Sequence, residues 1–225
     1  MTLFFDYLGL WLILPLTWGV VYYGAFLHKH EYRFYFGSFL FVLVLLGWLA
    51  LHDMFSVFLE VPVIYDIFFV GHLPFALFTL VMLGGAFKHK SKAKIALMRV
   101  RRELAILGFL FLLPHAVLRG SLALTGFNFT GLIAFWIIVP LVITSWPSVR
   151  KKMSPKRWKE VHRFAYIVYV MIYVHLVFDV SFVNGSIFMT LKRTGIPYLM
   201  LFLVYLGLKT ANYIVPWFRQ KRHPA

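Results

Sequence analysis

Long apolar segments separated by short polar stretches run along almost the whole chain. A helix needs about 20 mainly apolar residues to cross the hydrocarbon core of a bilayer. The two shortest segments approach that length if their helices extend by a few residues. The apolar segments lie at 3–27, 35–51, 67–87, 104–124, 131–146, 161–182 and 195–217. The pattern therefore predicts an all-α integral membrane protein, a bundle of about seven transmembrane helices.

The composition supports a membrane protein and excludes several other classes. Of the 225 residues, 61% are hydrophobic and 14% are charged, whereas soluble domains are about half apolar and about a quarter charged. Because the crossings occupy most of this length, we expect any flavin- or nucleotide-binding domain to be a separate chain. The sequence contains no cysteine, which excludes thiolate ligands and cysteine-bound iron–sulfur clusters.

The basic residues are distributed very unevenly between the two sides of the predicted bundle. Twenty of the 23 lysines and arginines fall in alternate loops and at the C-terminal end, and five of the eight acidic residues lie on the other side. By the positive-inside rule, the N-terminus is outside and the C-terminus is cytoplasmic. The basic loops suit contact with anionic lipids, or docking of an acidic partner or a phosphate-bearing flavin or nicotinamide. Their place at the membrane face argues against nucleic acid, and we predict that His28 in one of them is solvated.

Several histidines fall inside the apolar segments, where an ionisable side chain is costly and raises a functional question. They are His72, His115, His162 and His175. We expect His115 and His175 at similar depth in the outer halves of two helices that run in the same direction. Two facing imidazoles can each give one axial nitrogen to a haem iron, whereas zinc takes a third or fourth ligand. The alternative is that each histidine is a hydrogen-bonded packing residue.

The spacing of His162 and His175 bears on the number of haems. Thirteen residues separate them, which is about 20 Å along a helix and suits one haem near each membrane face. The same spacing turns a straight helix by about 220°, so the two rings do not share one face. Two haems bound along the same face of this helix therefore require a bent or overwound helix. Otherwise, His162 faces a different neighbour or a cytoplasmic site.

Several short motifs follow one another in the second half of the chain. They are RRELA at 101–105, PHA at 114–116, TSWPS at 144–148, KRWKEVHRFAY at 156–166 and YVHLVF at 173–178. This series resembles the ferric reductase-like transmembrane domain family. It is most similar to the branch of haem-binding membrane subunits of periplasmic methionine sulfoxide reductase systems. The similarity extends over about residues 66–217, and Val161 stands where that branch usually has leucine.

The resemblance implies a ligand set for haem. His115 and His175 would bind an outer haem, and His162 would bind an inner haem. The sequence does not show a second ligand for His162, because Arg101 and Arg102 occupy the corresponding end of the preceding histidine-bearing helix. The resemblance thus implies haem b, one or two per chain, and leaves FMN, FAD and quinone open as further cofactors.

Two more residues join this candidate site from the sequence itself. His72 is an alternative outer ligand, or a contact for protons and quinone. Arg119 lies one turn beyond His115 and fits either the partner of a haem propionate or an interfacial arginine. The resemblance also divides the chain into a two-helix extension at 1–65, a haem-binding transmembrane domain at 66–217 and a basic cytoplasmic tail at 218–225.

The function implied by the resemblance is transmembrane electron transfer in a bacterial inner membrane. Electrons would pass from a cytoplasmic flavin, a flavin reductase using NAD(P)H or membrane quinol to an extracytoplasmic acceptor such as a methionine sulfoxide reductase. The chain would be an oxidoreductase subunit rather than a self-contained enzyme. A stand-alone ferric-chelate reductase is one alternative. A non-redox proton or metal transporter that uses the intramembrane histidines is another, from a different class.

Overall fold

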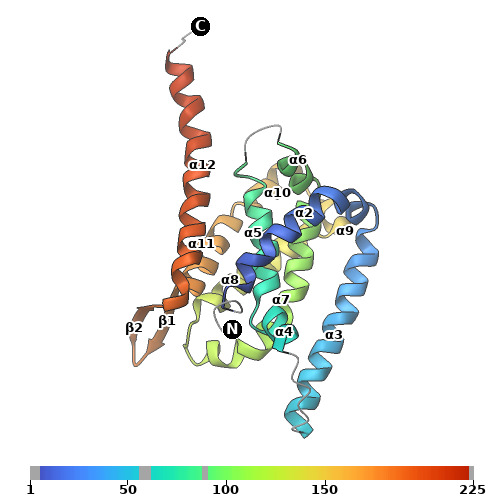
Figure 1. Ribbon diagram of the computed structural model, residues 1–225, viewed down its shortest axis with the longest axis vertical. Coiled ribbons are helices and arrows are strands. Elements are labelled where there is room, and N and C mark those ends of the chain that lie inside the picture. The colour runs from blue at the N-terminus through green and yellow to red at the C-terminus, as the bar shows by residue number, and fades with distance from the viewer. Residues whose placement is uncertain (1–5, 56–61, 88–90, 223–225) are drawn as a thin grey trace.

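The computed structural model describes residues 6–55, 62–87 and 91–222, and most of them are helical. Figure 1 shows the helices running roughly along one direction, with a small hairpin at one end. The elements are α2 (Leu8–Lys29), α3 (Glu31–Phe55), α4 (Pro62–Ile64), the π-helical η1 (Tyr65–Phe69), α5 (His72–Leu83), α6 (Lys92–Arg99), α7 (Arg101–Leu124), α8 (Thr130–Ser145), α9 (Pro147–Arg150), α10 (Pro155–His162), α11 (Ala165–Val177), β1 (Phe178–Val183), β2 (Ser186–Leu191), the 3₁₀ turn η2 (Arg193–Gly195) and α12 (Ile196–Arg222).

Helix α5 forms the centre of the bundle, because its sequence is apolar on all sides and only a fully enclosed helix buries such a surface. Ala76 and Leu80 have no exposed surface. The helix packs against α2 and α7. A Cβ atom on Gly108 of α7 would lie 3.3 Å from the ring of Phe78, so glycine allows α5 and α7 to approach closely. The buried apolar residues thus gather around α5.

The outer helices expose apolar side chains that water would not tolerate over so large an area. On α3, Phe36 and Val44 are more than 60% exposed, and Met200 of α12 is similarly open. These surfaces suit the acyl chains of a bilayer, where an exposed apolar side chain carries no penalty. The arrangement supports a multi-pass membrane protein.

Five helices of the described chain are long and apolar enough to cross a membrane. They comprise α2, Glu31–Leu51 of α3, α7, the consecutive α10 and α11, and most of α12. Counting the pair formed by Pro62–Phe69 and His72–Leu83 as one bent span gives six. The remaining predicted crossing corresponds to α8, an apolar helix of 16 residues. The number of about seven crossings therefore stays a prediction.

Two predicted segments have a different local structure. The third is broken, with a bend of 44° between η1 and α5, because Gly71 adopts φ +94°, a conformation that glycine accepts readily. The sixth was expected to be helical to residue 182, and this is wrong, since the helix ends at Val177 and β1 begins at Phe178. The turn between β1 and β2 is Asn184–Gly185, both with positive φ, the two-residue signature of a tight hairpin. The all-α prediction therefore holds for the bundle but fails for this hairpin.

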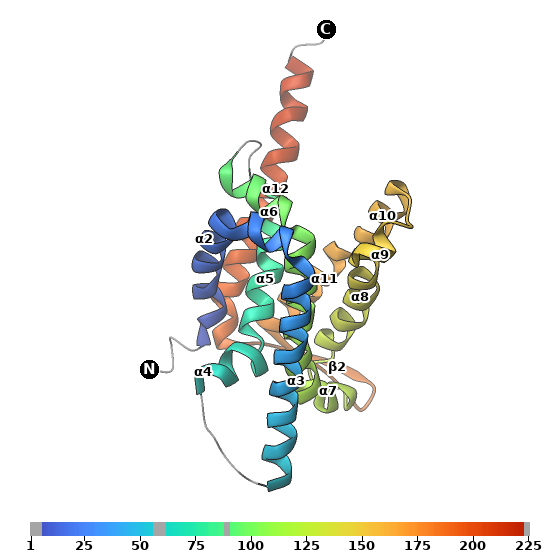
Figure 2. The same ribbon diagram turned by 90° about the vertical axis from the view of Figure 1, so that its right-hand side faces the viewer.

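The segments rich in lysine and arginine gather at one end of the molecule. Figures 1 and 2 show the α2–α3 junction, α6 and α10 at the same end, and α12 extending beyond them. The α4 segment and the β-hairpin lie toward the opposite end. Ser91 and Ser154 cap α6 and α10 by accepting hydrogen bonds from Lys94 N and Arg157 N, which fixes where these polar helices begin. Which end faces the cytoplasm stays a prediction from the positive-inside rule.

Candidate functional site

Helices α7 and α11 bring two of the predicted histidines together. His115 lies in the second half of α7 and His175 near the end of α11. Their ring centroids are 6.1 Å apart and the ring planes are nearly perpendicular, at 87°. Both side chains are partly buried. Two imidazoles from different helices therefore face a shared space inside the bundle.

The orientation of His115 is fixed by a main-chain hydrogen bond. Its Nδ1 lies 2.9 Å from the carbonyl oxygen of Phe69. A carbonyl only accepts, so Nδ1 must donate, and the lone pair of the neutral ring is then on Nε2. Phe69 is the last residue of the π-helical turn η1, just before the break at Gly71. This is the arrangement in which a second partner holds a metal-binding imidazole in its ligating tautomer.

Two glycines lie directly against the two imidazoles. A Cβ atom on Gly71 would lie 3.2 Å from the ring of His115, and one on Gly131 would lie 2.8 Å from the ring of His175. The second distance is shorter than real Cβ contacts, so any side chain at Gly131 would displace the His175 ring. The start of α8 therefore holds His175 in place by close contact.

A cavity of about 660 Å³ adjoins both rings. That size lies within the range of about 300–1,000 Å³ that is usual for cofactor and ligand sites. Apolar side chains such as Leu112, Phe135 and Ile138 line much of it. Its charged lining consists of Asp6, Asp66, Arg119, Asp179 and Lys192, and His72 lines it as well. The cavity thus combines an apolar interior with charges of both signs.

Lys192 and Arg119 are the cations of this cavity. Lys192 Nζ donates to the carbonyl oxygen of His175 at 2.8 Å and lies 3.1 Å from Asp179 Oδ1. Arg119 is exposed, and within the described chain it forms no ion pair. Its guanidinium is therefore available to an anionic group at the edge of the cavity.

The residues present fit an iron porphyrin held between His115 and His175. A metal ion lies about 2.0 Å from an imidazole nitrogen, so one ion between two opposed imidazoles holds their centroids about 6 Å apart, close to the observed 6.1 Å. His115 keeps Nε2 free. His175 Nδ1 is buried against Gly131, so Nε2 is the nitrogen of that ring that would bind the iron. The cavity is large and mostly apolar, as a porphyrin requires.

His162 is not part of this pair. It ends α10, its Nε2 lies 3.3 Å from Thr144 Oγ1, and its ring stacks on Trp158 with centroids 4.0 Å apart. A break at residues 163 and 164 separates α10 from α11, so the angular argument for one straight helix does not apply. No other histidine in the described part of the chain contacts His162. An inner haem at this position stays a prediction without a second ligand.

His72 lies beside the pair rather than in it. It is the first residue of α5, it is 9% exposed, and it packs against Gly9 of α2. It shares the cavity with His115 and His175, and its role as an outer ligand or as a contact for protons and quinone stays a prediction.

Sequence reasoning missed three features of the site: the Phe69 carbonyl, Gly131 and the Lys192–Asp179 ion pair. A main-chain acceptor leaves no side-chain signal, although Gly71 and Pro74 indicated that the helix is irregular there. Gly131 is one small residue among many in apolar segments. The pairing of Lys192 with Asp179 depends on the hairpin, which was not predicted.

Comparison with known proteins gives a family for the middle of the chain. Residues 89–173 match the model of the family described as ferric reductase like transmembrane component. The matched segment includes His115 and His162 and ends two residues before His175. No solved structure matches the chain.

The curated relatives are longer proteins. An uncharacterized protein of Treponema pallidum is 34% identical over 46% of this chain and 32% of its own length. The magnetosome protein MamZ of Magnetospirillum gryphiswaldense is 37% identical over 27% of this chain and 9% of its own. MamZ of Paramagnetospirillum magneticum is 25% identical over 40% and 16%. The chain spans about a third or less of the length of these relatives. The matches support a ferric reductase-like transmembrane segment that includes His115 and ends just before His175.

Proposed function

We propose that this protein is a membrane electron-transfer protein that holds one haem b between His115 and His175. The observation that carries the proposal is the separation of 6.1 Å between two imidazoles at the wall of a 660 Å³ cavity. The ferric reductase-like match over residues 89–173 supports the same function. Haem b, when bound, would supply one-electron chemistry.

The residues of the chain would set the properties of this site. The hydrogen bond from His115 Nδ1 to Phe69 fixes the orientation and the tautomer of the ring. The apolar lining excludes water and lowers the local dielectric, which shifts the potential of any bound redox group. Arg119 and Lys192 would neutralise the propionates, each through a charge-assisted hydrogen bond.

The direction of transfer follows from the predicted topology. A cytoplasmic donor, either reduced flavin from a separate reductase or membrane quinol, would give electrons at the end that carries the basic segments. An extracytoplasmic acceptor, such as a methionine sulfoxide reductase in a bacterial envelope, would take them near the cavity. A chelated ferric ion is the alternative acceptor, and the site residues would be the same.

The number of haems tests the assignment of residues. The 225-residue protein purified in detergent should contain one haem b per chain, measured as the pyridine haemochrome. The variant His162→Ala should keep that haem, because His162 contacts Thr144 and Trp158 rather than the pair. Two haems per chain, with one lost in His162→Ala, would overturn the single-haem proposal. Protein that stays colourless after expression with added haem would favour the transporter alternative.

A further inference from the structure

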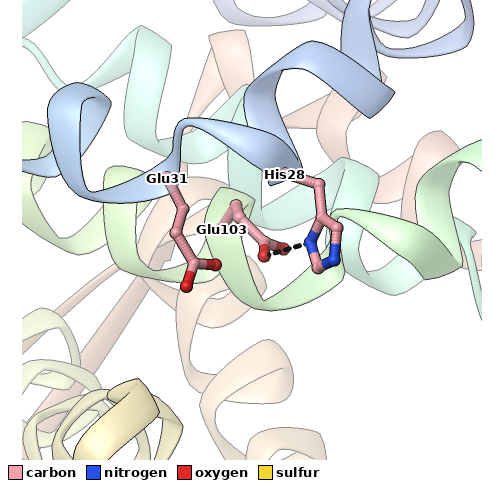
Figure 3. Close-up of side chains that lie close together, drawn as sticks. All are labelled: His28, Glu31 and Glu103. Atoms are coloured by element: carbon pink, nitrogen blue, oxygen red, sulfur yellow. Dashed lines mark hydrogen bonds and ion pairs between the residues drawn. The ribbon is translucent and has the colours of Figure 1, made fainter.

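A second polar cluster lies where α2, α3 and α7 meet, at the end of the molecule with the basic segments. Figure 3 shows His28 from the end of α2, Glu31 from the start of α3 and Glu103 from the first turn of α7 pointing toward one another. One potential ligand atom from each lies within 4.8 Å of the others. Three helices thus bring one imidazole and two carboxylates to a common point, and His28 is not simply solvated as the sequence suggested.

The hydrogen bonds of the cluster leave one carboxylate oxygen unused. His28 Nδ1 and Arg102 Nη2 each lie 2.8 Å from Glu103 Oε1. Arg102 also forms an ion pair with Glu31. While Glu31 is ionised, Glu103 Oε2 is buried and accepts no hydrogen bond within the described chain, and the whole Glu103 side chain is 1% exposed. A buried carboxylate oxygen without a partner is unfavourable unless something else neutralises it.

The charges of the cluster do not balance. Glu31 and Glu103 carry two negative charges when ionised, and Arg102 supplies one positive charge. While His28 is neutral, one negative charge remains among largely buried groups. A divalent cation that took the place of Arg102 between the two carboxylates would balance both of them, and it would give Glu103 Oε2 a partner.

We propose that His28, Glu31 and Glu103 bind a divalent first-row transition metal ion, such as Mn²⁺, Fe²⁺ or Zn²⁺. One imidazole nitrogen with carboxylate oxygens suits these ions, whereas Ca²⁺ and Mg²⁺ are held by oxygen ligands alone. The His28 side chain is half exposed, which gives the ion access from solvent. Arg102 holds the two carboxylates toward each other and competes with the ion for them.

The test is a metal titration of the 225-residue protein in detergent. After treatment with a chelator, Mn²⁺ is titrated while free Mn²⁺ is followed by electron paramagnetic resonance, and Zn²⁺ is titrated against a chromophoric chelator. The wild type should bind one equivalent. His28→Ala and Glu31→Gln should each weaken binding at least about tenfold, since each removes one ligand.

Two further variants separate this site from adventitious binding. His30→Ala removes a histidine between the same two helices whose ring contacts Phe26 instead, and it should bind like the wild type. Arg102→Gln should bind the ion more tightly, because the competing guanidinium is gone. Wild-type protein that binds less than one equivalent, equal losses in His28→Ala and His30→Ala, or weaker binding in Arg102→Gln would overturn the site. Haem content does not enter any of these readouts, so the result is independent of the His115–His175 proposal.

Discussion

The position of the His175 ring depends on a residue that has no side chain. Gly131 lies in the first turn of α8, and its Cα is so close to the ring that a Cβ would come within 2.8 Å of it. His115 is held differently, by a hydrogen bond to Phe69. One histidine is therefore fixed by close packing and the other by a hydrogen bond, and the two can be perturbed separately.

The steric part is tested by Gly131→Ala. The added methyl group should push the His175 ring from its position, with an overpacking penalty of about 1–3 kcal/mol, and haem retention should fall. Gly207→Ala is the matched control, since that helical glycine has no atom within 4 Å of an added Cβ. Haem content per chain and thermal unfolding in detergent measure the effect. If both variants retained haem equally, the close contact at Gly131 would not position His175.

The histidine pair could be foreseen from the sequence, but its surroundings could not. His115 and His175 were paired by depth, because both are polar residues at similar distances along apolar segments of known length. The His28 cluster was not foreseen, since a histidine in a basic loop looks solvated. Only the packing of three helices reveals that Glu31 and Glu103 lie next to it.

At the scale of elements, hydrogen bonds connect the β-hairpin to the loop between α7 and α8 and to the histidine site. Phe182 N donates to the carbonyl oxygen of Gly126 at 2.9 Å, and Lys192, just after β2, bonds to the carbonyl of His175. Helix prediction failed here because Phe178–Val183 is as apolar as a membrane helix. The signal that was present is Asn184–Gly185, a dipeptide typical of two-residue hairpin turns.

Gly126 and Gly185 both have positive φ, but only Gly126 also packs against another segment. Substituting each one therefore separates the cost of that packing from the cost of a left-handed backbone. Gly126 and Gly185 have φ of +92° and +78°, and a Cβ on Gly126 would clash with the carbonyl of Phe182, whereas Gly185 faces open space. Gly185→Ala should cost about 1–2 kcal/mol for left-handed backbone. Gly126→Ala should cost about 1–3 kcal/mol more, from the clash. Thermal unfolding in detergent compares them, and equal losses would mean that the loop and β1 are not tightly packed.

At the scale of the whole molecule, the sequence predicts a helical bundle, but it does not predict where individual spans break or end. Apolar segments of membrane-crossing length specify helices, because a helix satisfies its backbone hydrogen bonds within the same segment. The break at Gly71 and the end of α11 depend on local backbone geometry, which hydropathy does not report. The orientation rests on charge alone, and it determines from which side electrons would enter.

Orientation can be tested with single cysteines, because the natural sequence has none. Ser148 in α9 and Ser186 in the hairpin are both exposed and lie near opposite ends of the molecule. In intact cells, a membrane-impermeant maleimide should label Ser186→Cys but should label Ser148→Cys only after permeabilisation. The reverse pattern would place the histidine pair near the cytoplasm and invert the proposed direction of electron transfer.

The central claim is that His115 and His175 together hold a haem. Its most direct test is the dithionite-reduced minus oxidised visible spectrum of the purified protein, recorded beside His115→Ala, His175→Ala and the control His30→Ala. We predict a low-spin b-type spectrum in the wild type and in His30→Ala, and its loss in both other variants. A low-spin spectrum that survives in either His115→Ala or His175→Ala would contradict the account.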